Sequence, residues 1–193
     1  LNDKSISLIN ILLSNVPKDY MWTLELLFLD FDIDNSVLQI ENILNNDSLS
    51  IFHTEILFFM TIFQSKVTND NHKLTFYLNK IGEDYKENIL LNYTAVLILK
   101  KLGKNNLCLD VLNNRPRNNS LPFYYLDYLH GLSYLYNLDF SKAKYYFELF
   151  INNFEGHNFI KSTYFYLSCI EYISNNENRM NTYIESIKNN GDT

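Results

Sequence analysis

The feature that most constrains this chain is a ladder of apolar pairs that recurs at a nearly constant interval. In each pair the two apolar residues are four positions apart, so they lie on one face of a helix. The five pairs are Ile40/Leu44, Leu74/Leu78, Cys108/Leu112, Ala143/Phe147 and Met180/Ile184. Successive pairs begin 34, 34, 35 and 37 residues apart. Such a period is typical of an array in which each repeat is one helical hairpin.

The residues between the expected helices support the same interpretation. Five positions before each pair, the chain has a residue that in most cases tolerates a tight turn. These residues are Asn35, Asn69, Gly103, Leu138 and Asn175. No long segment alternates apolar and polar residues as a strand would. We therefore expect an all-α fold, a right-handed α-solenoid of tandem helix-turn-helix repeats.

The expected array forms one repeat domain over residues 1–193. Its hairpins cover approximately residues 17–46, 47–80, 87–114, 122–153 and 158–190. A helix at about residues 5–15 has no partner before it, so we interpret it as the second half of another repeat. We therefore expect the chain to be a fragment of a longer protein.

The fourth hairpin has the most specific residue pattern. Gly131, Tyr134, Ala143 and Phe147 stand at the spacing at which tetratricopeptide repeats (TPRs) have Gly, Tyr, Ala and Phe. The third hairpin is similar and has Ala95, Gly103, Cys108 and Leu112. The chain therefore resembles the TPR family. The resemblance implies small residues where the two helices of a hairpin cross closely, and aromatic residues between neighbouring hairpins.

Three longer segments resemble uncharacterised TPR proteins of Bacteroidetes-type bacteria. They are residues 17–27 (PKDYMWTLELL), 121–132 (LPFYYLDYLHGL) and 156–161 (GHNFIK). Those proteins resemble exported or envelope-associated scaffolds without an assigned activity. The resemblance implies a location in the bacterial cell envelope or periplasm, while the residues themselves leave a cytoplasmic location open.

Composition and charge exclude several classes of function. The formal net charge is −6, whereas a nucleic-acid-binding protein needs clustered cations to neutralise phosphates. No apolar run approaches the ~18 residues that a transmembrane helix needs. The two cysteines, Cys108 and Cys169, are not in a metal-binding spacing. We therefore expect no nucleic acid, no membrane span and no cofactor.

No catalytic pattern accompanies the ladder. The four histidines have no second metal ligand three or four positions later in the chain, and no phosphate loop or nucleophile elbow is present. His130 is expected to be a hydrogen-bonded packing residue inside its hairpin. We therefore expect a protein that is not an enzyme. The alternative is the non-catalytic part of a larger enzyme whose active site lies elsewhere.

The resemblance also implies where a partner would bind. In TPR arrays the first helix of each hairpin lines a concave groove. The corresponding residues here are aromatic or aliphatic: Trp22, Phe59, Phe63, Tyr93, Leu97, Tyr125, Tyr128, Leu132 and Phe165. Because none is Lys or Arg, this face does not resemble the grooves that clamp a peptide carboxylate. We expect a protein-protein interaction scaffold that binds an apolar peptide or an amphipathic helix. The alternative is that these side chains are ordinary core.

One acidic segment suggests a different function. Asp30, Asp32, Asp34 and Glu41 fall at positions 1, 3, 5 and 12 of an EF-hand calcium loop. However, Asn35 replaces the usual glycine of position 6, and the ladder places the second half of the loop in a helix. The segment is therefore either a calcium-responsive module or an acidic turn whose helix is capped by Asp34 or Asn35.

Overall fold

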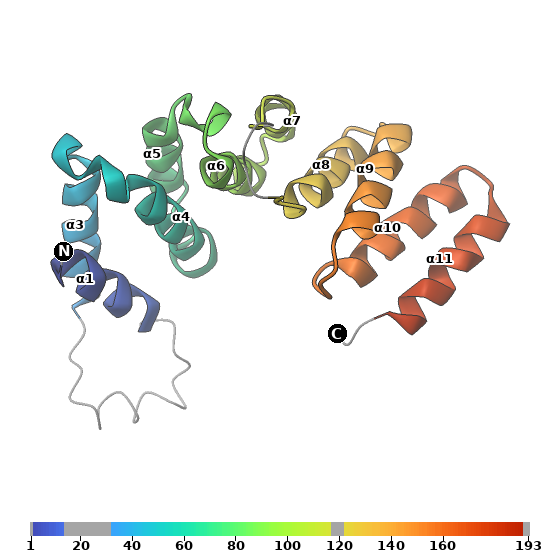
Figure 1. Ribbon diagram of the computed structural model, residues 1–193, viewed down its shortest axis with the longest axis horizontal. Helices are drawn as coiled ribbons and strands as arrows, with labels where there is room; N and C mark the ends of the chain where they lie inside the picture. Colours follow the sequence, from blue (N-terminus) through green and yellow to red (C-terminus); the bar gives the residue numbers. More distant parts are fainter. Residues whose placement is uncertain (1, 14–31, 117–121, 191–193) are drawn as a thin grey trace, which may run out of the picture. The chain divides into compact units, whose positions relative to one another are not determined.

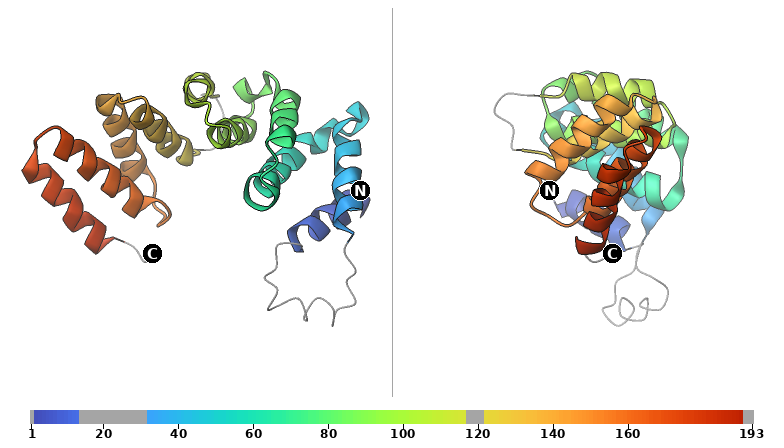
Figure 2. Two further views of the ribbon diagram at one scale, coloured as in Figure 1. Left: turned by 180° about the vertical axis from the view of Figure 1, so that it is seen from behind. Right: turned by 90° about the vertical axis from the view of Figure 1, so that its right-hand side faces the viewer.

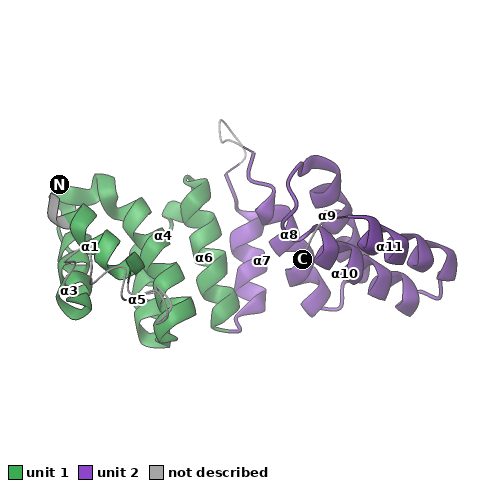
Figure 3. Cartoon of the chain, turned by 90° about the horizontal axis from the view of Figure 1, so that it is seen from below, with its two compact units in different colours: residues 1–102 green, residues 103–193 purple. Residues whose placement is uncertain are grey.

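The computed structural model describes residues 2–13, 32–116 and 122–190 (Figure 1). All regular elements in these ranges are helical, and no strand occurs in them. The prediction of an all-helical chain is therefore confirmed. The chain divides into two compact units, Leu1–Leu102 (unit 1) and Gly103–Thr193 (unit 2), which are coloured separately in Figure 3. Each unit has a core of its own.

Unit 1 contains five of the described α-helices. They are α1 (Asn2–Leu13), α3 (Ile33–Leu44), α4 (His53–Phe63), α5 (Asn71–Ile81) and α6 (Ile89–Lys101). Helix α1 lies beside α3, and α4 packs against both α5 and α6 (Figure 2). Sequence neighbours are therefore also neighbours in space within this unit.

The second expected hairpin, residues 47–80, does not begin with an α-helix. Instead of starting α4, Asp47–Phe52 forms a 3₁₀ turn, and the side chain of Asn46 accepts a hydrogen bond from the Ser48 N–H at 3.1 Å. Helix α4 starts only at His53. A π-helical turn, Gln64–Thr68, follows the helix and leads into the turn before α5.

Unit 2 contains helices in antiparallel pairs. Its helices are α7 (Asn105–Asn113), α8 (Tyr125–Tyr136), α9 (Phe140–Asn153), α10 (Ile160–Ile173) and α11 (Glu177–Asn189). Helices α8 and α9 form one pair and α10 and α11 the next, as Figure 1 shows. Helix α10 also packs against α9, so the second pair lies directly on the first.

Four of the five expected turn residues have a left-handed backbone. The φ angles are 54° at Asn69, 70° at Gly103, 60° at Leu138 and 55° at Asn175. This conformation closes a helix and reverses the chain within a few residues. Asn35 differs because it lies inside α3. The cap of that helix is Asp32, whose carboxylate accepts the Asn35 N–H at 2.9 Å, and not Asp34 or Asn35 as expected.

The sequence period reappears in hydrogen bonds between neighbouring hairpins. In unit 1 the Tyr77 hydroxyl donates to Glu41, 36 residues earlier, at 3.3 Å. In unit 2 the Tyr183 hydroxyl donates to Glu148, 35 residues earlier, at 2.9 Å. Both bonds connect the second helix of one hairpin to the second helix of the hairpin before it. The two units therefore share a hydrogen bond of the same kind at nearly the same sequence separation.

Most of the ladder is core. The buried members are Ile40, Leu44, Leu74, Cys108, Leu112, Ala143 and Phe147. Leu78 is partly buried. The fifth pair is different, because Met180 is partly exposed and Ile184 is 36% exposed. Helix α11 therefore leaves uncovered a face that the other second helices bury.

The crossing of α8 and α9 depends on a glycine. A Cβ atom placed on Gly131 would lie 2.5 Å from Cδ1 of Phe147. Real Cβ atoms do not approach other heavy atoms that closely, so any side chain here would push the helices apart. The expectation that small residues stand at the close crossing is confirmed for this pair.

Candidate interaction surface

The structure divides the expected groove residues into three groups. Phe63, Tyr128 and Leu132 are buried in the cores of their units. Phe59, Tyr93, Leu97 and Tyr125 are partly exposed. Phe165 is 55% exposed, and Trp22 lies outside the described residues. Within each unit, the expected groove positions therefore include both core residues and accessible ones.

Tyr128 belongs to the aromatic core of unit 2. Its ring stacks on Phe159 with 4.7 Å between centroids and lies 5.5 Å from the Phe150 ring. Burial raises the pKa of the Tyr128 hydroxyl to about 12, and Ser162 and Tyr166 lie beside that hydroxyl. Tyr128 thus holds α8, α9 and the start of α10 together. It is not free to contact a partner.

In unit 1 the accessible aromatic residues come from α4 and α6. Phe58 joins these helices, with its ring centroid 5.5 Å from that of Phe59 and 6.3 Å from that of Tyr93. Both Phe59 and Tyr93 keep part of their surface in solvent. Unit 1 therefore offers a small aromatic contact surface, in which the Phe58 ring packs against the rings of Phe59 and Tyr93.

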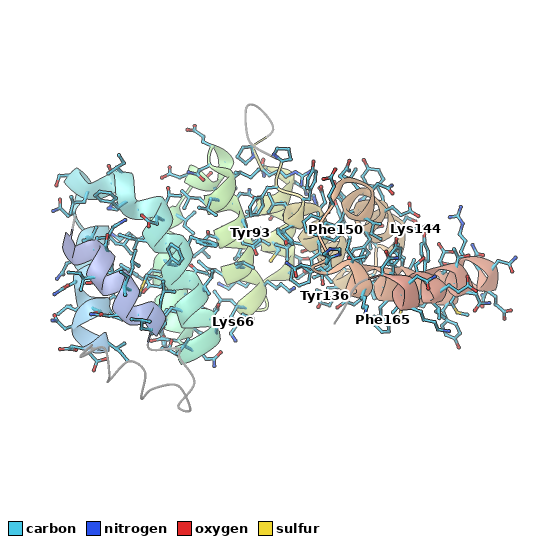
Figure 4. The ribbon with its side chains drawn as sticks, turned by 60° about the horizontal axis from the view of Figure 1, so that its bottom comes forward. Lys66, Tyr93, Tyr136, Lys144, Phe150 and Phe165 are labelled. Atoms are coloured by element: carbon cyan, nitrogen blue, oxygen red, sulfur yellow. The ribbon has the colours of Figure 1, made fainter. Side chains whose placement is uncertain are left out.

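In unit 2 the exposed aromatic face lies on α10 and the end of α8. Phe165 and Tyr172 are seven residues apart on α10, so they lie on the same side of the helix, and Tyr172 is 70% exposed. Tyr136, at the end of α8, is 57% exposed, and Figure 4 shows it on the same edge of the unit as Phe165. Cys169, partly exposed, lies between Phe165 and Tyr172.

Tyr136 and Tyr172 were not among the residues predicted from the sequence. Both follow a predicted groove position at helical spacing: Tyr136 is four residues after Leu132, and Tyr172 is seven residues after Phe165. The sequence therefore contained a signal for both residues, because they continue the helical spacing of the predicted groove positions. It was missed because the repeat pattern assigns no groove position to the last turn of the first helix.

His130 is a buried, neutral side chain within unit 2. Its ring stacks on Tyr146 at 3.9 Å and on Tyr134 at 5.1 Å between centroids. Burial, with a smaller effect of nearby Arg115, lowers the pKa of His130 to about 3. Within the described part of the chain, neither ring nitrogen has a hydrogen-bond partner. The expected packing role is confirmed, whereas the expected hydrogen bond is absent.

The acidic segment forms a helix rather than a loop. Because α3 begins at Ile33, the candidate calcium ligands Asp34 and Glu41 lie on that helix, and Asp32 caps it. Glu41 forms an ion pair with Lys73 on α5. Asp30 lies outside the described residues. Over residues 2–13, 32–116 and 122–190, no three His, Cys, Asp or Glu side chains gather in a way that could hold a metal ion.

No family model, curated protein or solved structure matches this chain. In the described ranges, no helix is both long enough and apolar enough to cross a membrane. The functional interpretation therefore depends on the chain's own geometry, and the feature of that geometry with the clearest chemistry is the exposed aromatic face of unit 2.

Proposed function

We propose that this protein is a TPR-like, right-handed α-solenoid that acts as a non-catalytic protein-interaction scaffold. Its ligand is an apolar peptide or an amphipathic helix of a partner protein. The observation that carries the proposal is the exposure of the aromatic residues Phe165, Tyr136 and Tyr172 in unit 2. Contiguous exposed apolar surface is typical of protein-protein interaction sites.

The chemistry of the face favours an apolar helix over a charged ligand. The positions that face solvent along α10 between Phe165 and Tyr172 include no Lys, Arg, Asp or Glu. A charged peptide would lose hydration at this face without gaining an ion pair. An amphipathic helix would instead bury aliphatic side chains between the aromatic rings, which is a common mode of peptide recognition.

The repeat features support the scaffold part of the proposal. Helices in adjacent pairs, left-handed turns at a regular spacing and hydrogen bonds across about one repeat are all typical of helical arrays. Unit 1 has partly exposed aromatic side chains of its own, Phe59 and Tyr93. Arrays of this kind commonly serve as binding surfaces because much of each helix stays accessible.

A displayed library of random 16-residue peptides, selected against the whole chain, tests the proposal. The selected peptides are expected to carry apolar residues at helical spacing and no excess of either charge. Isothermal titration then compares the wild-type protein with Phe165→Ser. Loss of one buried phenyl group is expected to weaken binding at least about tenfold.

Tyr145→Ser is the matched control, because Tyr145 is equally exposed but lies on α9. Its affinity for the selected peptides is expected to equal that of the wild type, and circular dichroism verifies that both variants are folded. Selection of charged peptides, or equal binding by wild type and Phe165→Ser, contradicts the proposed binding face.

A further inference from the structure

The turn between α8 and α9 carries a residue that fits its backbone poorly. In the equivalent turns of the other hairpins, the residue with positive φ is Asn69, Gly103 or Asn175, and these residue types adopt a left-handed backbone readily. Leu138 has this position in the α8–α9 turn, with φ 60°. Burial does not offset the strain, because the Leu138 side chain is 73% exposed. Backbone outliers that the packing of the fold does not explain cluster at functional sites.

The exposure of this turn does not result from where the array ends. Helices α10 and α11 form the next hairpin, and α10 packs against α9. With that hairpin in place, Tyr136, two residues before Leu138, is still 57% exposed. The residue 37 positions later, Ile173 at the end of α10, is exposed to a similar extent, 55%. A following hairpin therefore leaves this position open, because it lies beside the turn and not on the face that the next hairpin covers.

Hydrogen bonds hold the turn against the start of α7. The Asn105 amide donates to the Ser133 carbonyl oxygen at 2.9 Å and to the Asn137 side chain at 2.6 Å. The Asn137 amide donates in turn to the side chain of Asn106 at 3.1 Å. The turn is therefore ordered before any partner binds, which lowers the entropic cost of binding.

Helix α7 adds an exposed apolar side chain near the turn. Leu107 follows Asn106 in the chain and is 47% exposed. Because Asn106 bonds to Asn137, and Leu138 follows Asn137, the two leucines belong to one small area of unit 2. We call Leu107, Tyr136 and Leu138 the turn patch. Apolar side chains within a rim of asparagine amides have the composition of a protein interface.

The polar groups around the turn patch complement one another and not a charged ligand. The charged side chains of the turn itself, Asp139 and Lys142, form an ion pair with each other at 3.1 Å. Within the part of the chain that the structure describes, no hydrogen bond uses the amide oxygen of Asn105 or the amide nitrogen of Asn106. These groups are an acceptor and a donor on consecutive residues. A two-fold axis between two copies can therefore place each donor opposite an acceptor.

We propose that the turn patch is a self-association surface, on which a second copy of this chain packs about a two-fold axis. Burial of Leu138 between the copies supplies the stabilisation that the folded monomer does not obtain from this side chain. The patch is small compared with the roughly 800 Å² that each partner buries in a standard interface, so the dimer is weak and forms at high concentration. The proposal does not depend on the proposed function, because Leu107 and Leu138 are not part of the aromatic face.

Sedimentation velocity of the whole chain, between about 10 µM and about 1 mM, tests the proposal. The wild type is expected to sediment faster as its concentration rises. Leu138→Asn is expected to weaken self-association at least about tenfold, because it removes an apolar side chain from the centre of the interface. Leu107→Asn is expected to weaken it by a smaller factor. Since Asn occupies two of the equivalent turns, Leu138→Asn is expected to fold, and circular dichroism checks this.

Ile51→Asn is the matched control, because Ile51 is an aliphatic residue of unit 1 that is 82% exposed. It is expected to self-associate like the wild type. A wild-type chain that stays monomeric over the whole range overturns the proposal, and so does equal self-association of wild type and Leu138→Asn. Self-association that Phe165→Ser abolishes and Leu138→Asn retains also overturns it, because the interface then lies on α10.

These results are independent of the peptide titrations that test the proposed function. Those titrations compare wild type with Phe165→Ser, and Leu138→Asn is expected to bind the selected peptides like wild type. Absence of the dimer together with peptide binding that depends on Phe165 contradicts only the self-association surface. A dimer that Leu138→Asn dissociates, in a chain whose selected peptides bind without regard to Phe165, contradicts only the proposed binding face.

Discussion

Unit 1 and unit 2 follow nearly the same repeat spacing but fill their cores with different side chains. The core of unit 1 is mainly aliphatic, with Ile40, Ile56, Met60, Leu74 and Ile98 fully or almost fully buried. The core of unit 2 depends on aromatic rings, with Tyr128, Phe147 and Phe150 buried together. The aliphatic core needs no glycine at its crossings, whereas the aromatic core needs Gly131.

The comparison shows what a repeat spacing determines and what it leaves free. The spacing sets where helices start and turn, because left-handed residues recur in both units. The spacing does not set the size of individual core side chains. Large and small residues can both occupy the core, as long as a large residue on one helix faces a small one on the other. Polar groups differ as well: unit 1 buries Tyr77 beside the Glu41–Lys73 ion pair, and unit 2 buries His130 among aromatic rings.

The largest expected difference between the units is at Gly131. Gly131→Ala places a methyl group against the Phe147 ring and is expected to lower the free energy of unfolding by about 2–3 kcal/mol. Urea denaturation followed by circular dichroism measures the loss. Hydrogen exchange locates it, and amides of α8 and α9 are expected to lose protection before those of α4 to α6.

The double variant Gly131→Ala/Phe147→Leu is the matched control, because a smaller partner makes room for the new methyl group. It is expected to recover part of the loss. Equal loss of protection in unit 1 would show that the two units unfold together. It would contradict the idea that only the core of unit 2 depends on Gly131.

The second difference concerns acid. The pKa of His130 is about 3 in the folded chain and about 6.5 when unfolded, so the unfolded state binds the proton more readily. The stability from neutral His130 is complete above pH 6.5 and declines as the pH falls from 6.5 towards 3. At pH 5 the free energy of unfolding is expected to be about 2 kcal/mol lower than at pH 7.5 because of this residue.

His130→Phe keeps a stacking ring without a titrating group, so its stability is expected to change less between pH 7.5 and pH 5. Chemical denaturation at both pH values, for wild type and variant, measures the difference. An identical loss of unfolding free energy in both proteins would mean that other groups cause the acid sensitivity. His130 would then not distinguish the two units.

A third, smaller effect tests the hydrogen bond that recurs between hairpins. Tyr77→Phe removes the donor to Glu41 from a fully buried position and is expected to cost about 1 kcal/mol. Tyr183→Phe removes the equivalent donor to Glu148 from a partly exposed position, so its cost is expected to be smaller. Thermal unfolding of both variants gives the order. The reverse order would mean that the exposed end of unit 2 is more rigid than its burial indicates.

The smallest effect is at the turn residues. Leu138 has a left-handed backbone at φ 60° although its side chain is 73% exposed and packs little. Leu138→Asn introduces the residue type that Asn69 and Asn175 supply at the equivalent turns, and it is expected to stabilise the chain by about 0.5–1 kcal/mol. A melting temperature that falls in this variant would show that Leu138 makes a contact needed by unit 2.

The sequence predicts the helices well because their signals are local. Apolar residues four apart indicate one buried face, and Asn or Gly five positions earlier indicates a left-handed turn. Asn35 was predicted to be a turn residue but lies inside α3, because Asp32 is an equally good cap three residues earlier. The late start of α4 was missed because Asp47 and Ser48 have capping chemistry, yet Asn46 caps a 3₁₀ turn there.

The interaction surface is less predictable because exposure depends on the next helix in space. Tyr128 and Phe165 occupy equivalent positions and are both aromatic, but only Tyr128 is covered by Phe159 and α10. Nothing within either residue's own helix distinguishes them. Similarly, a hydrogen bond for His130 cannot be inferred from the residue type, because the rings of Tyr134 and Tyr146 contact its ring by stacking.

The most direct test of the central claim, that the aromatic face of unit 2 binds a helix, is a two-dimensional NMR titration. The isotope-labelled whole chain is titrated with an unlabelled peptide selected from the displayed library. We expect the largest chemical-shift changes at Tyr136, Phe165 and Tyr172, with small changes in unit 1. Changes concentrated at Phe59 and Tyr93, or no saturable changes at all, would contradict the claim.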